Sequence, residues 1–418
     1  MKILHTSDWH LGQYFMGKSR KNEHRALITW LFECVEIRAI DVVIIAGDIF
    51  DTGSPPSYAR ELYNQLVLGL HQRGCQLVIV AGNHDSVSML NESRSLLAEL
   101  NTYVVSSAKP NEPNEHVVRL YRKGTTDAAA LLCAIPYIRP RDIFQSEAGL
   151  DERSKQGLLA EQIKDFYHDV YQVAQQDAKE LGGLPILGSG HLTTLGASIS
   201  ESVREIYVGT LESFPLDYFP AFSYLALGHI HRPQKVAGLD HVRYSGSPIP
   251  LSFDEVATNK NMVLVDYSSS HTAPEIQTID VPLFQALFSV SGELDYVVKA
   301  LKQEELNLDR SQDETMRLWA EVTLISDEYV SDLYRQLQMA IEGLDIDLLR
   351  VKRLLKTQAQ SMPQGTKETL AELSVEQVFE RCLNSAGIEE DGDKLTGLFK
   401  QHYQAMLTQQ QELDDENL

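Results

Sequence analysis

Short apolar runs that end in a polar residue recur along the first two-thirds of the chain. The runs cover residues 2–6, 42–46, 77–81, 186–187 and 224–227. Each is followed by a loop or by a segment with helical spacing, an alternation typical of an α/β fold. Polar residues just beyond the carboxyl ends of such strands meet at one edge of the sheet, so the pattern predicts a functional site there.

The final third of the chain has a different pattern of apolar and polar residues. Strands are expected at 284–290, 317–325 and 347–354, and helices at 293–306 and 328–342. Together they predict a small α+β domain, and a polar stretch with proline and glycine after it is typical of a linker. The predicted domains are therefore 1–282 and 283–355, followed by a linker at 356–372 and a C-terminal segment at 373–418.

The C-terminal segment contains two stripes of apolar side chains at helical spacing, separated by an acidic turn. They predict a helix–loop–helix whose apolar faces pack on each other, on the body of the protein or on a partner. Its place beyond a linker, the short length of each helix and its acidic charge favour a partner. The stripes consist of Val375, Val378, Phe379, Cys382 and Leu383, and of Leu395, Leu398, Phe399, His402 and Met406.

Charge and composition limit the classes of function. The 418 residues include 37 basic and 59 acidic side chains, and the net charge of -22 repels a nucleic-acid backbone at long range. Metal ions, local clusters of arginine and lysine, or a basic partner would have to hold such a substrate. No apolar run approaches the roughly 20 residues of a membrane span, and the start is unlike a signal peptide, so we expect a cytoplasmic protein.

Two common kinds of site find no support in the sequence. The cysteines form no C-x-x-C pair and lie among apolar neighbours, which is typical of reduced, structural thiols. No G-x-x-x-x-G-K-[ST] motif occurs, so we do not expect this chain to bind ATP through a P-loop. The four cysteines are Cys34, Cys75, Cys133 and Cys382.

Five short motifs follow the predicted strands of the first domain. Taken singly, each has an ordinary explanation, because aspartate often caps helices or turns and a lone histidine is usually a hydrogen-bonded core residue. Together they favour a metal site with nitrogen and oxygen ligands, which suits Mn²⁺, Fe²⁺ or Zn²⁺ better than Mg²⁺. The motifs are Asp8-x-His10, Gly47-Asp48-x-x-Asp51, Gly82-Asn83-His84-Asp85, Gly190-His191 and Gly228-His229-x-His231.

This arrangement resembles the calcineurin-like metallophosphoesterase superfamily, which implies a β-sandwich flanked by helices. Within it, the motif segments, the stretch 51–56 and the C-terminal segment are similar to the bacterial SbcD family of nuclease subunits. That resemblance implies a DNA endonuclease and 3′–5′ double-strand exonuclease. Such an enzyme cleaves DNA ends and hairpins and acts in DNA replication, recombination and repair.

The resemblance also assigns the ligands of the metal site. It implies two Mn²⁺ ions that share the carboxylate of Asp48. Two cations about 3.5 to 4 Å apart can activate a water for in-line attack and neutralise charge on the phosphate. One ion would be completed by Asp8, His10 and His231, and the other by Asn83, His191 and His229.

His84 directly follows a predicted ligand. By resemblance it would lie over the phosphate and give a hydrogen bond or a proton to the leaving oxygen, a contribution of about 10²- to 10⁴-fold in rate. Asp51 would orient the His84 imidazole. Two roles stay open for Asp85, either as a second partner of His84 or as the cap of the helix that begins near Ser86.

Several basic residues are candidate phosphate contacts, although a solvated charged face is the simpler explanation for any one of them. As a set they would offset the acidic background near the site. They are Lys18, Arg20, Lys21, Arg60, Arg139, Arg141 and Arg232.

The resemblance implies partners as well. Residues 373–418 would bind the ATPase SbcC on its coiled coil near the ATPase head, in a heteromeric, nucleoid-associated complex that contains a homodimer of this chain. SbcC would then be the component that binds ATP. Two rival functions are a phosphatase or small phosphodiesterase, which would not need the final third of the chain, and a scaffold that keeps metals for folding, which would not need His84.

Overall fold

The computed structural model describes residues 1–143, 152–194, 213–268, 273–308, 316–326 and 330–354. The chain divides into two units, Met1–Leu355 and Lys356–Leu418, and the second lies outside the described residues. The linker predicted at 356–372 and the helix pair predicted at 373–418 therefore stay predictions.

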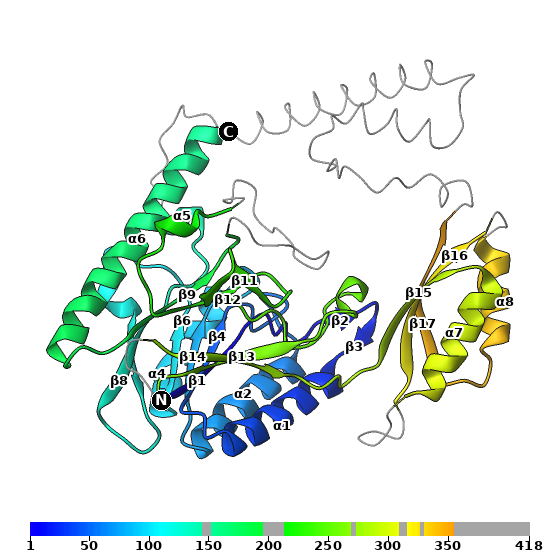
Figure 1. Cartoon of the computed structure of the whole chain (residues 1–418), viewed down its shortest axis with the longest axis horizontal. Helices are drawn as coiled ribbons and strands as arrows, with labels where there is room; N and C mark the ends of the chain where they lie inside the picture. Colours follow the sequence, from blue (N-terminus) through cyan, green and yellow to red (C-terminus); the bar gives the residue numbers. More distant parts are fainter. Residues whose placement is uncertain (144–151, 195–212, 269–272, 309–315, 327–329, 355–418) are drawn as a thin grey trace. The chain divides into compact units, whose positions relative to one another are not determined.

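The first three motifs directly follow three neighbouring strands of one six-stranded sheet (Figure 1). Its strand order is β14-β13-β1-β4-β5-β6, with β1, β4, β5 and β6 parallel and with β13 and β14 antiparallel to their neighbours. The strands are β1 (Lys2–Thr6), β4 (Val42–Ala46), β5 (Gln76–Val80), β6 (Thr102–Val105), β13 (Asn261–Asp266) and β14 (Glu275–Asp280).

A second six-stranded sheet carries the two histidine motifs. Its order is β11-β12-β10-β9-β8-β7, with a parallel centre and an antiparallel strand at each edge. The strands are β7 (Val117–Tyr121), β8 (Ala128–Cys133), β9 (Ile186–His191), β10 (Tyr224–Gly228), β11 (Gln234–Val236) and β12 (Leu239–Tyr244).

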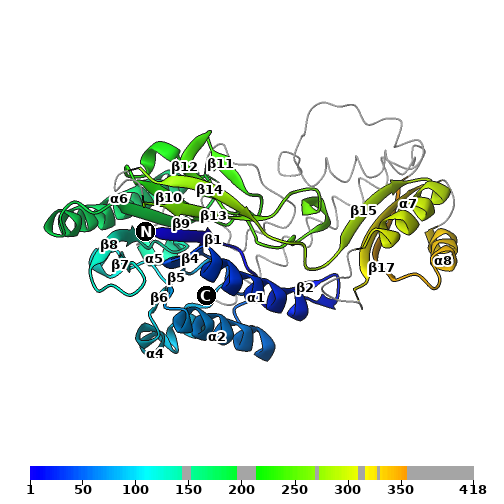
Figure 2. The same ribbon diagram turned by 60° about the horizontal axis from the view of Figure 1, so that its bottom comes forward.

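The two sheets pack face to face, with helices on both outer sides (Figure 2). Along β4 the side chains alternate: Ile44 points to the facing sheet, whereas Val43 and Ile45 point to the helices. Both faces of the strand are buried, which explains why its sequence is continuously apolar. Helices α1 (Lys21–Ile37) and α2 (Ser57–Gln72) cover the first sheet, and α6 (Glu152–Glu180) covers the second. The predicted β-sandwich flanked by helices is confirmed.

The described residues from Leu287 to Leu354 form a three-stranded parallel sheet with both of its helices on one face (Figure 1). The first strand of this sheet begins at Leu287, three residues after its predicted start. The residue predicted to begin it, Phe284, instead packs against the core between the first sheet and helices α1 and α2. Phe15, Phe253, Leu287 and Trp319 form an apolar cluster between this sheet and the body. The elements are β15 (Leu287–Gly292), α7 (Leu294–Leu306), β16 (Leu318–Ile325), α8 (Val330–Ala340) and β17 (Ile346–Leu354).

Short elements fill the connections. They are β2 (Tyr14–Phe15), β3 (Lys18–Ser19), α3 (Val87–Asn91), α4 (Arg94–Glu99), α5 (Pro140–Ile143), and the 3₁₀ turns η1 (Pro113–His116), η2 (Leu216–Tyr218) and η3 (Phe253–Glu255). Cys34, Cys75 and Cys133 are buried, as expected of structural thiols, and Cys382 lies outside the described residues. Among the helices that the structure describes, none has the length and apolar character to cross a membrane.

Candidate metal centre

The loops after β1, β4, β5, β9 and β10 meet at one edge of the sandwich. The first two loops run side by side, because the Asp8 N–H donates to the Gly47 carbonyl and the His10 N–H to the Asp48 carbonyl, each at 3.0 Å. In the second sheet, His191 pairs with Gly228, which precedes His229. The strand pairing therefore brings the five motifs together from distant parts of the chain.

The predicted ligands gather in two clusters. In the first cluster, Asp8, His10 and His231 each offer a ligand atom within 4.8 Å of the others. In the second cluster, Asp48, His191 and His229 do the same. The side-chain oxygen of Asn83 lies 3.0 Å from Nε2 of His191 and 3.1 Å from Nδ1 of His229, so Asn83 adjoins the second cluster.

Asp48 connects the two clusters. Its Oδ2 lies 3.2 Å from Nε2 of His191 and 3.7 Å from Nε2 of His10. Burial opposes ionisation, but the neighbouring His191 holds the pKa of the Asp48 carboxyl well below its usual range. A buried carboxylate between two histidine clusters has the chemistry of a bridging ligand.

The residues fit a pair of divalent cations. Buried polar atoms almost always have a hydrogen-bond partner. Nε2 of His10 is buried beside Asp48, yet it has no hydrogen-bond partner among the residues that the structure describes. An imidazole nitrogen left in this state, next to carboxylates and further imidazoles, suits a transition-metal ion. The assignment of each residue as a ligand remains a prediction.

The histidines of the centre differ in pKa. Burial favours the neutral ring, but Asp48 raises the pKa of His191 to about 9. Burial and the adjacent His191 lower the pKa of His229 to about 3. Burial also opposes the charge on His10, whose pKa is nevertheless raised by Asp51 and Asp48. His229 is therefore ready to bind a cation at neutral pH, whereas His191 has to lose a proton.

The backbone of the motif loops is unusual. Asp8, His10, Asp48 and His229 have φ angles of 54°, 46°, 51° and 94°. Such left-handed conformations in residues other than glycine cost about 1–3 kcal/mol each and persist where the surroundings enforce them. A hydrogen bond from the His229 N–H to Oδ1 of Asp8, at 2.9 Å, helps to hold two of these residues in this conformation.

Two motif positions are glycine because a larger residue would collide with a neighbouring side chain. Gly47 has a φ of +93°, and a Cβ on it would overlap the His191 ring. A Cβ on Gly82 would overlap the carboxylate of Asp48. The glycines before Asp48 and Asn83 thus allow the close approach that the clusters need.

His84 lies beside the first cluster, with its ring centroid 4.8 Å from that of His10. Its Nδ1 is 2.8 Å from the main-chain oxygen of Asp51. Asp51 thus contacts His84 through its main chain, where the sequence suggested the carboxylate. Oδ1 of Asp51 lies 3.1 Å from Nδ1 of His10, and the carboxylate lies within 4.8 Å of ring nitrogens of both His10 and His84.

Neither of the two roles left open for Asp85 matches its contacts. Its carboxylate accepts hydrogen bonds from the main-chain N–H groups of Ile49, Phe50 and Gly82, at 3.2, 3.0 and 2.8 Å. The Ser86 side chain caps α3 instead, by accepting from the Met89 N–H. Asp85 thus ties the second and third motif loops together, a positioning role that its place in the motif did not reveal.

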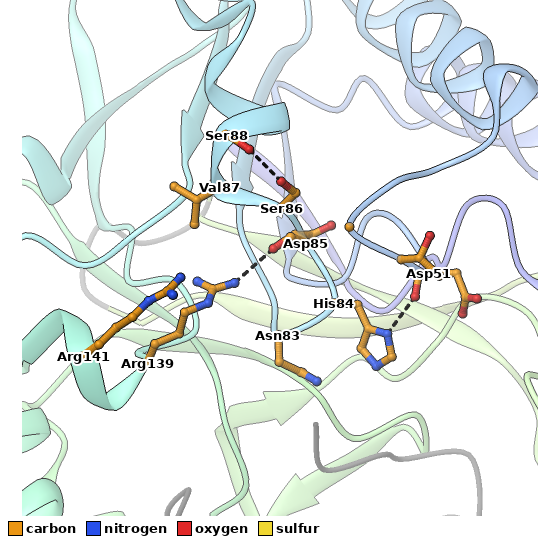
Figure 3. Close-up of a pocket in the computed structure, with 11 residues that line it drawn as sticks. Asp51, Asn83, His84, Asp85, Ser86, Val87, Ser88, Arg139 and Arg141 are labelled. Atoms are coloured by element: carbon orange, nitrogen blue, oxygen red, sulfur yellow. Dashed lines mark hydrogen bonds between the residues drawn. The ribbon is translucent and has the colours of Figure 1, made fainter. Parts of the chain in front are cut away.

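Four of the seven basic residues predicted as phosphate contacts have informative surroundings. Arg20 is buried against Glu23 at 2.6 Å and is not available as a phosphate contact, whereas the partly exposed Lys18 pairs with Asp347 at 2.7 Å. Arg139 and Arg141 line a pocket of about 780 Å³ that also contains His84 (Figure 3).

A further charged pair, Glu255 and Lys260, lies beside His231. Neither residue belongs to a motif, and both follow segments without a periodic pattern. The sequence therefore carries no signal that would have placed this pair at the centre.

Comparison with known proteins extends these observations. The calcineurin-like phosphoesterase model matches residues 1–233, and the model of the type 5 capsule protein repressor C-terminal domain matches residues 283–386. The SbcD component of the SbcCD nuclease from Escherichia coli (strain K12) is 46% identical over 393 residues, which cover 93% of this chain and 94% of that protein.

The chain belongs to the SbcD family. The SbcD proteins of Rhodobacter capsulatus and Bacillus subtilis are 30% and 31% identical, and the matches cover 83% and 64% of this chain. The share of those two proteins that is matched is 86% and 66%. As a member of this SbcD family of calcineurin-like phosphoesterases, the chain is a metal-dependent phosphodiesterase.

Proposed function

We propose that this SbcD family member is a DNA nuclease that hydrolyses phosphodiester bonds with two Mn²⁺ ions, as one component of a larger complex. The observation that carries the proposal is the pair of buried clusters joined by Asp48, with His84 beside them. Relatives named as components of a nuclease support DNA as the substrate. Endonuclease and 3′–5′ exonuclease activity on ends and hairpins, in replication, recombination and repair, belongs to the same proposal.

The chain's own residues divide the work. When bound, the two cations would activate a water and neutralise charge on the phosphate. Asp48 would be shared between them, with Asp8, His10 and His231 holding one ion and Asn83, His191 and His229 the other. His84 would contact the leaving oxygen through Nε2, because its Nδ1 is held by the Asp51 main chain.

The pocket beside His84 suits the phosphates that flank the scissile bond. Arg139 is fixed from behind, because its Nη2 donates to the Asp85 carbonyl at 3.0 Å, while the side chain of Arg141 is 75% exposed. Hydroxyl groups of Thr52, Ser86 and Ser88 also line this pocket. Such a local basic and polar surface would hold DNA against the acidic charge of the whole chain.

Four imidazoles among seven ligands favour Mn²⁺ over Mg²⁺, which prefers an all-oxygen shell. The test is hydrolysis of single-stranded and hairpin DNA by protein stripped of metal and reloaded with Mn²⁺ or Mg²⁺. We expect cleavage with Mn²⁺ and much slower cleavage with Mg²⁺. Rapid turnover of nitrophenyl phosphoesters without any DNA cleavage would overturn the proposal in favour of a small-substrate phosphodiesterase.

The partner forms the second part of the proposal. We infer that residues 373–418 bind an SbcC-type ATPase on its coiled coil near the ATPase head, in a nucleoid-associated cytoplasmic complex that contains two copies of this chain. ATP would be bound by that partner. Truncation after residue 356 is expected to leave a Mn²⁺-dependent nuclease that no longer co-purifies with the ATPase, and retained binding with unchanged affinity would contradict this assignment.

A further inference from the structure

A buried ion pair adjoins the first cluster, outside all five motifs. Glu255 ends the short turn η3 and is 1% exposed, and Lys260 follows in the loop before β13 and is 6% exposed. Nζ of Lys260 lies 2.6 Å from Oε2 of Glu255. Burying two charges costs solvation free energy, and an apolar pair of similar size is often as stable, so stability alone does not explain this pair.

The contacts of Glu255 point to His231. Its Oε1 lies 3.5 Å from Nδ1 of His231, while its Oε2 accepts from the Leu251 N–H at 3.1 Å and from Lys260. Oε1 also accepts from Oγ of Ser252 at 3.3 Å, so these contacts together hold the carboxylate beside the imidazole. With Nδ1 of His231 beside Glu255, the opposite nitrogen is the one available to the first cluster.

Lys260 holds the main chain of the same residue. Its Nζ donates to the His231 carbonyl at 3.0 Å and to Oγ of Ser247 at 2.8 Å, in addition to Glu255. These three acceptors use all three N–H bonds of the ammonium group. The side chain and the main chain of His231 are thus both restrained by one buried pair.

We propose that Glu255 and Lys260 are positioning residues that set the metal affinity of the first cluster through His231. The inference rests on the proposed function, in which His231 is a metal ligand. A carboxylate behind a ligating imidazole fixes the ring orientation and increases its basicity, and removal of such a partner typically lowers metal affinity about 10- to 100-fold. Lys260 keeps Glu255 in place and balances its charge.

The second cluster supplies an internal reference. Nδ1 of His191 lies 2.9 Å from the main-chain carbonyl of Ala46, so no side-chain carboxylate stands behind this imidazole at Nδ1. Loss of the Glu255 charge should therefore weaken one of the two ions and leave the other unchanged. A general loss of structure would instead affect both.

The test is a Mn²⁺ titration of the full-length metal-free protein, followed by calorimetry and by electron paramagnetic resonance. The parent is expected to bind two ions and to give the spectrum of a coupled pair. Glu255→Gln should bind one ion with parental affinity and the second about 10- to 100-fold more weakly. Asp240→Asn is the control, because it removes the same charge from an exposed position of β12 and should not change either affinity.

A double variant separates positioning from folding. Glu255→Gln combined with Lys260→Met leaves no unpaired buried charge, so it should fold even where the single variant is unstable. It should show the same selective loss of one ion. Two parental affinities in both folded variants would overturn the inference and leave the proposed function intact. A parent chain that fails to bind two Mn²⁺ ions would overturn the proposed function, and this inference with it.

Discussion

The two clusters of the metal centre are held in different ways. In the first cluster, His10 contacts the carboxylate of Asp51 and His231 contacts that of Glu255. In the second, Nδ1 of His191 contacts a main-chain carbonyl, and His229 contacts the neutral amide of Asn83. Main-chain support does not depend on any one side chain, whereas carboxylate support adds charge and can be altered by substitution. We therefore expect the affinity of the first cluster to be the more adjustable of the two.

The largest effect is expected where the two clusters meet. Asp48→Asn removes the carboxylate that adjoins both His10 and His191, so both ions should bind more weakly. We expect nuclease activity to fall more than about 10⁴-fold, beyond the contribution of a general acid. Metal analysis of the gel-filtered variant checks the cause, with Asp240→Asn on the exposed surface as control. Full occupancy of both sites would show that Asp48 is not shared.

His84→Ala should come next, because it changes chemistry without changing either cluster. Activity should fall about 10²- to 10⁴-fold while both Mn²⁺ affinities and DNA affinity stay close to the parent. Single-turnover cleavage at saturating metal measures the loss. His71→Ala, at the exposed end of α2, serves as control. A loss below about threefold would exclude His84 as the proton donor, since it lies under the range of such groups.

Asp51→Asn sharpens the comparison, because the carboxylate contacts the first cluster and the main chain holds His84. We expect a Mn²⁺ affinity about 10- to 100-fold lower for one ion and activity that recovers at excess Mn²⁺. Cleavage measured across a Mn²⁺ series distinguishes the two contacts. Activity that stays low at saturating Mn²⁺, with unchanged affinity, would show that the carboxylate acts on His84 instead.

The smallest effect concerns pH and the second cluster. Burial opposes charge on His191, but Asp48 raises its pKa to about 9, above the ordinary value of about 6.5. The charged ring therefore stabilises the metal-free fold fully below pH 6.5, and this contribution is lost as pH rises towards 9. Mn²⁺ affinity should rise between pH 6.5 and 8, by at most about tenfold per pH unit for one displaced proton. Titrations at both pH values check this, and an affinity that falls with pH would contradict it.

Urea unfolding of the metal-free protein at several pH values tests the raised pKa of His191 in a second way. The free energy of unfolding should decrease from pH 6.5 to pH 8.5, because the folded state keeps the His191 proton that the unfolded state releases. His241→Gln, at an exposed position of β12, should leave the pH dependence as it is in the parent. A metal-free protein that becomes more stable over this interval would show that the Asp48–His191 pair does not dominate.

The sequence by itself determined the α/β texture and the positions at which chemistry is placed. Runs such as 42–46 are continuously apolar because strand β4 is buried on both faces. A metal-competent residue directly after such a strand has only a narrow set of positions in space. For this reason Asp8, Asp48, Asn83, His191 and His229 could be grouped before their contacts were known.

Only the tertiary structure decided which side chain supports which ligand. Asp51 was expected to contact His84 through its carboxylate, and it does so through its main-chain oxygen, while Oδ1 lies beside His10. Glu255 and Lys260 resemble surface residues in the sequence and are nonetheless buried beside His231. Hydrophobic periodicity reports which face of an element is buried, whereas these polar contacts depend on the exact path of loops that carry no periodic pattern.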